Sequence, residues 1–280
     1  MAMPQLRYQW FCASLVGLII TIGLSGCAAL VDLTEPRIAE SPHLLFGNPS
    51  DAAPRLDLPN NYLVIKPEFA LSYNRDRGTA NWVSWQLNET WLGETERRDR
   101  FRHDPDLPEA WPVITSRDYR DRRYDRGHIA PSGDRTVSRE ANDATFVLSN
   151  IMPQVPGNNR GPWNDLENYS RSLVRQGKEL YIMAGPIGQK GRIGQAQVVV
   201  PQSTWKVILV LEQPGGDDWS VTPQTRVIAV NMPNLPSIED RSWQDFRVTV
   251  DELEQLTGYD FLSVLDNQTE AAIESRVDSE

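Results

Sequence analysis

A chain of 280 residues, 40% of them hydrophobic, is long enough for one large domain with its own core and a short appendage. The formal net charge of −10 would by itself argue against a nucleic-acid partner. Its distribution changes that conclusion, because residues 206–280 hold 5 basic and 15 acidic residues, which accounts for the whole excess. Residues 97–139 instead hold 11 arginines and 8 acidic residues. Arginine is the side chain best suited to bidentate phosphate contacts, so this segment favours a phosphate-binding role.

Residues 1–26 have the composition of a signal peptide. Arg7 is followed by an apolar stretch of about fifteen residues, shorter than the twenty or so that span a membrane. The stretch ends in Leu24-Ser25-Gly26-Cys27, which resembles the lipobox of bacterial lipoproteins. We therefore expect an exported protein with a lipid anchor at Cys27, in the periplasm or at the outer membrane; ordinary secretion is the alternative. Because Cys12 lies inside the signal, cleavage excludes an intrachain disulfide.

Residues 27–60 mix prolines with polar residues and predict a tether and lead-in to a domain that covers 61–280. Residues 94–127 are charged and read as a loop. Within 81–87, Val83, Trp85 and Leu87 alternate with polar residues, which is the period of a half-buried strand. Strands are predicted at 62–66, 69–73, 81–87, 145–148, 179–184, 197–200, 204–212 and 225–231.

The clearest predicted helix covers 161–176, because Pro162 suits a first turn and Gly177 suits a terminator. Shorter helices are predicted at 250–257 and 268–277. Strands outnumber helices, and most connections are too short for parallel crossovers. The predicted fold class is therefore α+β, with a largely antiparallel central sheet flanked by helices.

Four side chains around the start of the predicted long helix recur every four residues: Asn159, Trp163, Glu167 and Arg171. On one continuous helix this spacing drifts by about 40° per step, so the four would lie on one side. A structural interpretation makes Asn159 a helix cap, Trp163 a core residue, and the other two a surface ion pair worth a few tenths of a kcal/mol. We adopt that interpretation for Trp163 only.

The polar members gain meaning from His128, which follows an arginine and a glycine. Hydrolysis of a phosphodiester needs a base, a cation and hydrogen-bond donors on the phosphate. Neutral imidazole suits the first task, and the side-chain carbonyl of Asn159 is a hard ligand for Mg²⁺ or Mn²⁺, with Glu167 holding the ion's waters. Cysteine and histidine are too scarce for zinc. His43 and His103, without comparable neighbours, are assigned to structure or surface.

The run Asp125-Arg126-Gly127-His128 resembles the signature of the DNA/RNA non-specific endonucleases, the ββα-metal or His-Me finger nucleases. The likeness is strongest to the secreted sugar-non-specific nucleases of cyanobacteria and runs through the whole domain. It covers residues 43–44, 46–50, 78–83, 97–102, 125–135, 150–154, 158–163, 181–186 and 256–262. The resemblance implies a ββα-metal motif at the active site.

The resemblance also implies roles for individual residues. His128 matches the general base that activates water, and Asn159 matches the direct ligand of a hydrated Mg²⁺ or Mn²⁺. Glu167 matches the carboxylate that holds water around the ion, and Arg97 matches the arginine that stabilises charge on the phosphate.

Three further positions complete the implied site. Arg126 and Arg171 match additional arginines of the site, and Asn150 matches a polar residue that supports His128; we group Arg171 and Asn150 with substrate binding. Asp125 has no role that follows from the residues alone, beyond orienting Arg126 or its loop.

The expected function is therefore a metal-dependent endonuclease that cleaves single- and double-stranded DNA and RNA, without sequence or sugar preference, to 5′-phosphorylated products. A site of arginines and a metal reads phosphates, which carry no sequence information. We expect the acidic C-terminal third to lie away from the substrate. Two alternatives stay open: an exported lipoprotein that binds nucleic acid without cutting it, and a structure-selective endonuclease. No inhibitor protein is identified by the sequence.

Overall fold

The structure is a computed structural model that describes residues 41–216 and 220–280. The predicted signal peptide, Cys27 and the first part of the predicted lead-in lie outside these residues. Within the two described ranges, no helix combines the length and the apolar character needed to cross a membrane.

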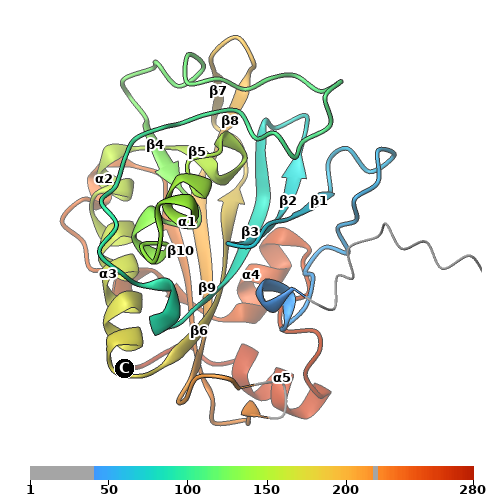
Figure 1. Cartoon of the computed structure of the whole chain (residues 1–280). Helices are drawn as coiled ribbons and strands as arrows, with labels where there is room; N and C mark the ends of the chain where they lie inside the picture. The colour runs from blue at the N-terminus through green and yellow to red at the C-terminus, as the bar shows by residue number, and fades with distance from the viewer. Residues whose placement is uncertain (1–40, 217–219) are drawn as a thin grey trace, which may run out of the picture. The chain divides into compact units, whose positions relative to one another are not determined.

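A seven-stranded antiparallel sheet forms the centre of the molecule, in the order β1-β2-β3-β6-β9-β10-β11 (Figure 1). Its strands are β1 (Tyr62–Ile65), β2 (Ala70–Asn74), β3 (Thr79–Leu87), β6 (Glu179–Ile187), β9 (Ser203–Leu211), β10 (Arg226–Pro233) and β11 (Arg247–Val248). Two small antiparallel sheets pair β4 (Asp125–His128) with β5 (Ile151–Gln154), and β7 (Gly191–Ile193) with β8 (Val198–Val200). The predicted fold class is confirmed.

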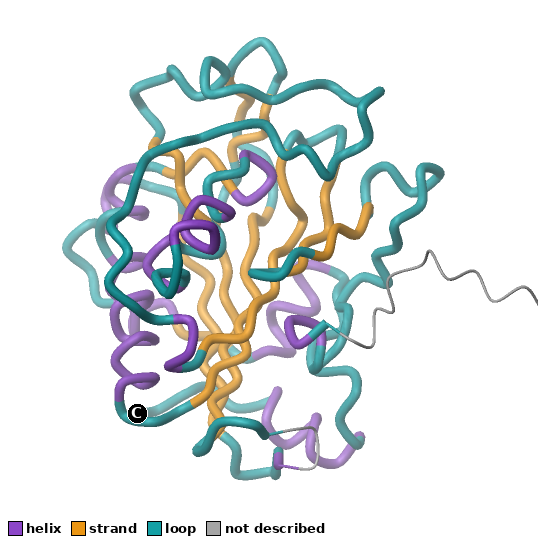
Figure 2. Tube along the Cα trace, viewed as in Figure 1, coloured by secondary structure: helices purple, strands orange, loops and turns teal. Residues whose placement is uncertain are grey.

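The described α-helices are α1 (Arg139–Ala144), α2 (Pro156–Asn159), α3 (Pro162–Arg175), α4 (Val250–Thr257) and α5 (Asn267–Glu274). The predicted helices 161–176 and 250–257 agree with α3 and α4, and α4 ends at Gly258 in the left-handed conformation, as a terminating glycine should. Long loops connect several elements (Figure 2), and residues 94–124 contain none of the helices or strands. The predicted loop 94–127 is therefore correct up to residue 124 and wrong for residues 125–127, which belong to β4.

Each face of the central sheet carries its own apolar core. On one face, Val83, Trp85 and Leu87 of β3 pack with Trp163 and residues of β5, which confirms the predicted alternation. On the other face, Trp82 packs with Leu253 of α4, Ile273 of α5 and the segment before β1. The two cores place α3 and the β4–β5 hairpin on one side of the sheet, and α4 and α5 on the other.

The start of the packed domain lies earlier than the predicted boundary at residue 61. Phe46 and Ala52 are buried with Trp82 in the second core, and the Trp82 indole donates to Ser50 Oγ at 2.7 Å. His43 is also buried, with Nε2 bonded to Pro67 O at 2.8 Å and Nδ1 accepting from Gln86 N at 3.2 Å. Residues 41–60 are therefore part of the domain and not a free tether, and the structural assignment of His43 agrees with its contacts.

The predicted strand at 145–148 is wrong. Val147 makes a single bridge to Arg102, and Leu148–Asn150 form a 3-10 turn that leads directly into β5. Val147 and Leu148 are both buried, so a short apolar run of core residues was taken for a strand, an ambiguity that periodicity cannot resolve.

The β4–β5 hairpin yields a test of local packing at Gly127. A Cβ added there would lie 1.9 Å from Gln154 Oε1 and 2.8 Å from Gln154 Cβ, and Gln154 is completely buried. We expect Gly127→Ala to lower the free energy of unfolding by about 1–3 kcal/mol, because the hairpin must open to admit the methyl group. Gly191→Ala, in a strand with open space around the site, is the matched control. Equal urea-unfolding midpoints for the two variants would contradict this packing.

Candidate active site

His128 closes the β4 strand, opposite Ile151 of β5. Its ring packs edge-on against Phe146, with centroids 4.8 Å apart, and lies 5.6 Å from Phe101. The side chain is 6% exposed, and among the described residues its Nε2 atom has no hydrogen-bond partner. Burial, and then the charge of Arg97, lower the pKa of His128 to about 3, so the imidazole is neutral near pH 7.

Asn150 supports the loop that follows His128. Its Oδ1 accepts from Ala130 N at 2.9 Å, and its Nδ2 donates to Ala130 O and Thr145 O at 2.8 and 2.9 Å. The side chain is completely buried and does not line the cleft. Its grouping with substrate binding therefore needs correction, whereas the support of His128 that the resemblance implies fits its position.

Asp125, at the other end of β4, holds the residue predicted to bind the metal. Its Oδ2 accepts from Asn159 Nδ2 at 2.9 Å, and Arg160 donates to both carboxylate oxygens, at 2.7 and 2.8 Å. Burial alone would raise the pKa of Asp125, but the bonds from Arg160 and Asn159 outweigh it and the pKa is lowered. An ionised carboxylate can only accept, so the NH₂ group of Asn159 faces Asp125 and its carbonyl oxygen is left for another partner.

The four side chains that recur every four residues, Asn159, Trp163, Glu167 and Arg171, do not lie on one helix. Asn159 ends α2, and α3 begins at Pro162, with Gly161 between them. A Cβ on Gly161 would lie 2.5 Å from Glu239 O and 2.6 Å from Gly157 O, so this break requires glycine. Asn159 is thus not a cap of α3. Trp163 is 1% exposed and lies in the core, as predicted.

Glu167 and Arg171, on α3, belong to a buried group of charges. Arg171 donates to Asp134 Oδ1 at 2.7 Å, and the same carboxylate accepts from Trp85 Nε1 at 3.0 Å. Burial raises the pKa of Glu167, and the charges of Lys206 and Arg171 act against that rise. Lys206 is 1% exposed, and its ammonium lies 4.0 Å from the centroid of the Trp163 ring. The structural alternative of an exposed ion pair between Glu167 and Arg171, which we do not adopt from the sequence, is therefore not what the structure shows.

A cleft of about 480 Å³ brings most of the predicted site residues together. Its lining includes His128, Arg97, Arg126, Asn159, Glu167 and Arg171. Of the four arginines between residues 97 and 102, only Arg97 lines this cleft. Arg98 pairs with Asp143 and Arg102 donates to the carbonyl of the same residue, so both point elsewhere.

The two arginines from the loop and the hairpin keep donors available. Arg97 donates to Asp99 and, at 3.3 Å, to Ser132, and it lies over the Phe146 ring. Arg126 stacks over Phe101, and its buried Nε has no partner within the described ranges. All cleft-lining residues fall between 95 and 171, so the acidic C-terminal third contributes none of them, as expected.

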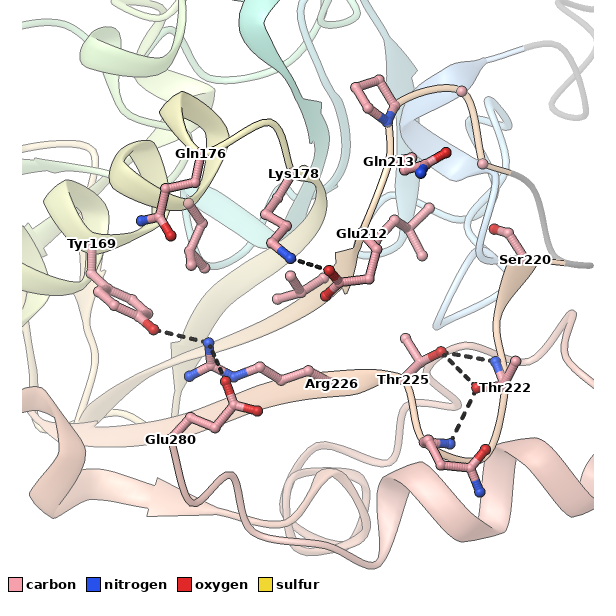
Figure 3. A pocket seen from close by; sticks show the side chains of 17 residues that line it. Tyr169, Gln176, Lys178, Glu212, Gln213, Ser220, Thr222, Thr225, Arg226 and Glu280 are labelled. Carbon is pink, nitrogen blue, oxygen red and sulfur yellow. Dashed lines mark hydrogen bonds and ion pairs between the residues drawn. The ribbon is translucent and has the colours of Figure 1, made fainter.

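A larger cavity, of about 960 Å³, shares no lining residue with the cleft (Figure 3). Its charged side chains are bonded to one another: Lys178 to Glu212, and Arg226 to Tyr169 and Glu280. It contains none of the predicted site residues. The cleft at His128 is therefore the candidate active site.

The sequence did not predict the roles of three residues of the site. Asp125 binds both Asn159 and Arg160, and Lys206 lies beside Glu167. Asp125 and Arg160 flank predicted residues in the sequence, so adjacency was a usable signal. Lys206 lies in a predicted strand far along the chain, and nothing nearby in sequence pointed to Glu167.

The chain is similar to known nucleases. The family model described as DNA/RNA non-specific endonuclease matches residues 53–268. The chain is 51% identical to a Nostoc sp. nuclease, over 95% of this chain and 97% of that one. It is 36% identical to human mitochondrial endonuclease G, over 71% of this chain and 69% of that protein.

The fold has a solved counterpart. An EndoG chain from a crystal structure of the EndoG/EndoGI complex superposes with a TM-score of 0.69 and 25% identity, over 84% of this chain and 95% of that one. The chain therefore belongs to the DNA/RNA non-specific endonucleases, which are hydrolases of phosphodiester bonds.

Proposed function

We propose that this nuclease cleaves DNA and RNA, single- or double-stranded, to 5′-phosphorylated fragments, with His128 as general base and Asn159 as the direct ligand of Mg²⁺ or Mn²⁺. The observation that carries the proposal is the bond between Asp125 and Asn159, which turns an amide carbonyl toward other partners in the cleft that His128 lines.

The residues of the cleft fit a hard divalent cation. The Asn159 carbonyl oxygen and the half-buried carboxylate of Glu167 are oxygen donors, which Mg²⁺ and Mn²⁺ prefer. Asp125 orients the amide in the way that outer-sphere partners orient metal ligands. When bound, the cation would neutralise the negative charge that develops on the leaving 3′ oxygen.

The side chains of the cleft divide the remaining work. Neutral His128 accepts the proton of the attacking water. Arg97 and Arg126, which each keep guanidinium surface toward the cleft, donate to the phosphate oxygens. Arg171 is held by Asp134 and so presents its charge at a fixed position.

Sugar and base tolerance follow from the same lining. Four arginines, Arg97, Arg126, Arg160 and Arg171, face a single acidic residue, Glu167, in the cleft. Contacts from guanidinium groups to phosphates position a nucleic acid without reading its bases. No part of this set requires a 2′-hydroxyl, so both DNA and RNA fit the proposed site.

The proposal is tested with the purified protein, supercoiled plasmid and single-stranded RNA in millimolar Mg²⁺. We expect cleavage of both substrates, loss of cleavage in EDTA, and a rate for His128→Ala lower by about 10²–10⁴, because the general base is removed. His103→Ala, which removes a histidine outside the cleft, is the matched control and should stay within a few-fold of wild type.

Three results would contradict the proposal. Binding of plasmid without cleavage would favour the lipoprotein that only binds nucleic acid. Cleavage restricted to one DNA structure, with intact linear duplex and RNA, would favour a structure-selective endonuclease. A His128→Ala rate close to wild type would place the base elsewhere.

The Asp125–Asn159 bond predicts how the metal requirement is set. Asp125→Ala frees the Asn159 amide to rotate, so we expect the Mg²⁺ concentration for half-maximal cleavage to rise by about 10- to 100-fold, with a smaller loss of kcat at saturating metal. Asp121→Ala removes a neighbouring carboxylate that pairs with Arg123 and should leave the metal titration unchanged. An unchanged titration in Asp125→Ala would remove Asp125 from the positioning role.

We further propose that the protein is exported and anchored through lipid on Cys27, on the strength of the apolar signal and the lipobox-like run. Cells grown with radioactive palmitate should yield labelled protein, and Cys27→Ser should yield none. Unlabelled wild-type protein in the medium would instead indicate ordinary secretion.

A further inference from the structure

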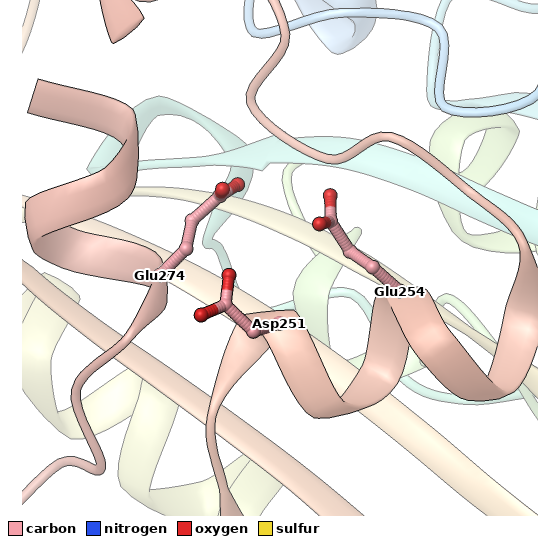
Figure 4. A group of neighbouring side chains, drawn as sticks. All are labelled: Asp251, Glu254 and Glu274. Carbon is pink, nitrogen blue, oxygen red and sulfur yellow. The ribbon is translucent and has the colours of Figure 1, made fainter. Parts of the chain in front are cut away.

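A group of three carboxylates lies on the face of the sheet opposite the active site. Asp251 and Glu254 are three residues apart on α4, and Glu274 is the last residue of α5. One carboxylate oxygen from each lies within 4.8 Å of the others, and the three side chains converge (Figure 4). In the part of the chain that the structure describes, no other group of three His, Cys, Asp or Glu side chains is arranged in this way.

Glu274 is the informative member of this acidic cluster. Glu274 is only 5% exposed, and its Oε1 atom is buried without a hydrogen-bond partner among residues 41–216 and 220–280. A buried unpaired carboxylate oxygen costs free energy comparable to a lost hydrogen bond or more. The position is also unfavourable for an anion, because Glu274 lies at the C-terminal, partially negative end of α5.

The charged groups that act on Glu274 from its surroundings are acidic: Glu254, Glu270, Asp251 and Asp260. No salt bridge within the described ranges involves Asp251, Glu254 or Glu274. Glu254 has one oxygen committed to Phe261 N, at 2.8 Å, which fixes its direction.

We propose that Asp251, Glu254 and Glu274 form a second, structural cation site that binds Ca²⁺. The donors are all carboxylate oxygens, which hard cations prefer. The three oxygens all lie within 4.8 Å of one another, so a single ion can contact all of them. Mg²⁺ is usually held by one or two carboxylates and keeps several waters, whereas Ca²⁺ takes more protein oxygens in a flexible geometry, so a group of three carboxylates favours Ca²⁺.

The ion ties the C-terminal region to the sheet. It joins α5 to α4, whose Val250 and Leu253 are completely buried in the second core. Beyond α5, Asp278 bonds to Arg226 of β10 at 2.8 Å and 3.0 Å. Calcium at the acidic cluster would therefore hold the last turn of α5 where the chain end can reach β10, and would stabilise the fold without touching the cleft.

The experiment measures thermal unfolding of metal-stripped full-length protein in which Asn159→Ala removes the proposed cleft ligand. We expect CaCl₂ to raise the melting temperature by on the order of 5–10 °C at one hundred times its dissociation constant, and MgCl₂ to raise it less. Adding Glu274→Gln should abolish the calcium increment and, since it relieves repulsion, raise the melting temperature of the stripped protein.

Glu270→Gln is the matched control, because it removes a neighbouring acid of α5 outside the cluster and should keep the calcium increment. The proposal fails if calcium gives no increment above NaCl of equal ionic strength. It also fails if Glu274→Gln retains the increment, which would mean that calcium binds elsewhere. Equal increments in Glu270→Gln and Glu274→Gln would reduce the effect to general charge screening and would overturn the site.

Discussion

The carboxylate of Asp125 links the parts on which the active site depends. It starts β4, the strand that ends at His128, and it binds the side chains of Asn159 and Arg160 at the end of α2. Asp125 lies at the start of β4 and its partners lie at the end of α2, so these bonds set the distance between the proposed base and the proposed metal ligand. The bonds from the Arg160 guanidinium are strong because the Asp125 carboxylate is ionised and the bonds are charge-assisted.

A second constraint lies in the wall of the cleft, where opposite charges are held together. Asp134 and Lys206 are buried behind Glu167 and Arg171, which line the cleft, so two acids are matched by two bases before any ligand binds. The Trp85 indole completes the cluster by donating to Asp134. Buried charges are tolerated when they are paired and hydrogen-bonded, and their fixed positions are useful where a phosphate must be met by preorganised donors.

The sequence predicted the elements whose pattern is local. The alternation in β3, the proline and glycine around α3, and the glycine after α4 each fix one element through residues a few positions apart. The predicted strand at 145–148 was wrong because its apolar residues show no period, and burial alone does not distinguish a strand from a turn. The site residues came from a motif. Asn159 and Arg160, by contrast, lie 34 and 35 residues from Asp125, and Lys206 lies 39 residues from Glu167, so only folding brings these partners together.

Gly161 separates the orientation of Asn159 on α2 from the orientation of Glu167 and Arg171 on α3, which a continuous helix would link. The helix is interrupted at Gly161, where the carbonyl of Glu239 leaves no room for a side chain. The direction of the Asn159 side chain is therefore set independently of the directions of Glu167 and Arg171. In a single helix, any change of pitch would move the amide and the carboxylate together. Here α3 is fixed by the buried Trp163, whereas the Asn159 amide at the end of α2 is oriented by Asp125 of β4. A change in the position of Asn159 on α2 therefore need not move Glu167 or Arg171 on α3.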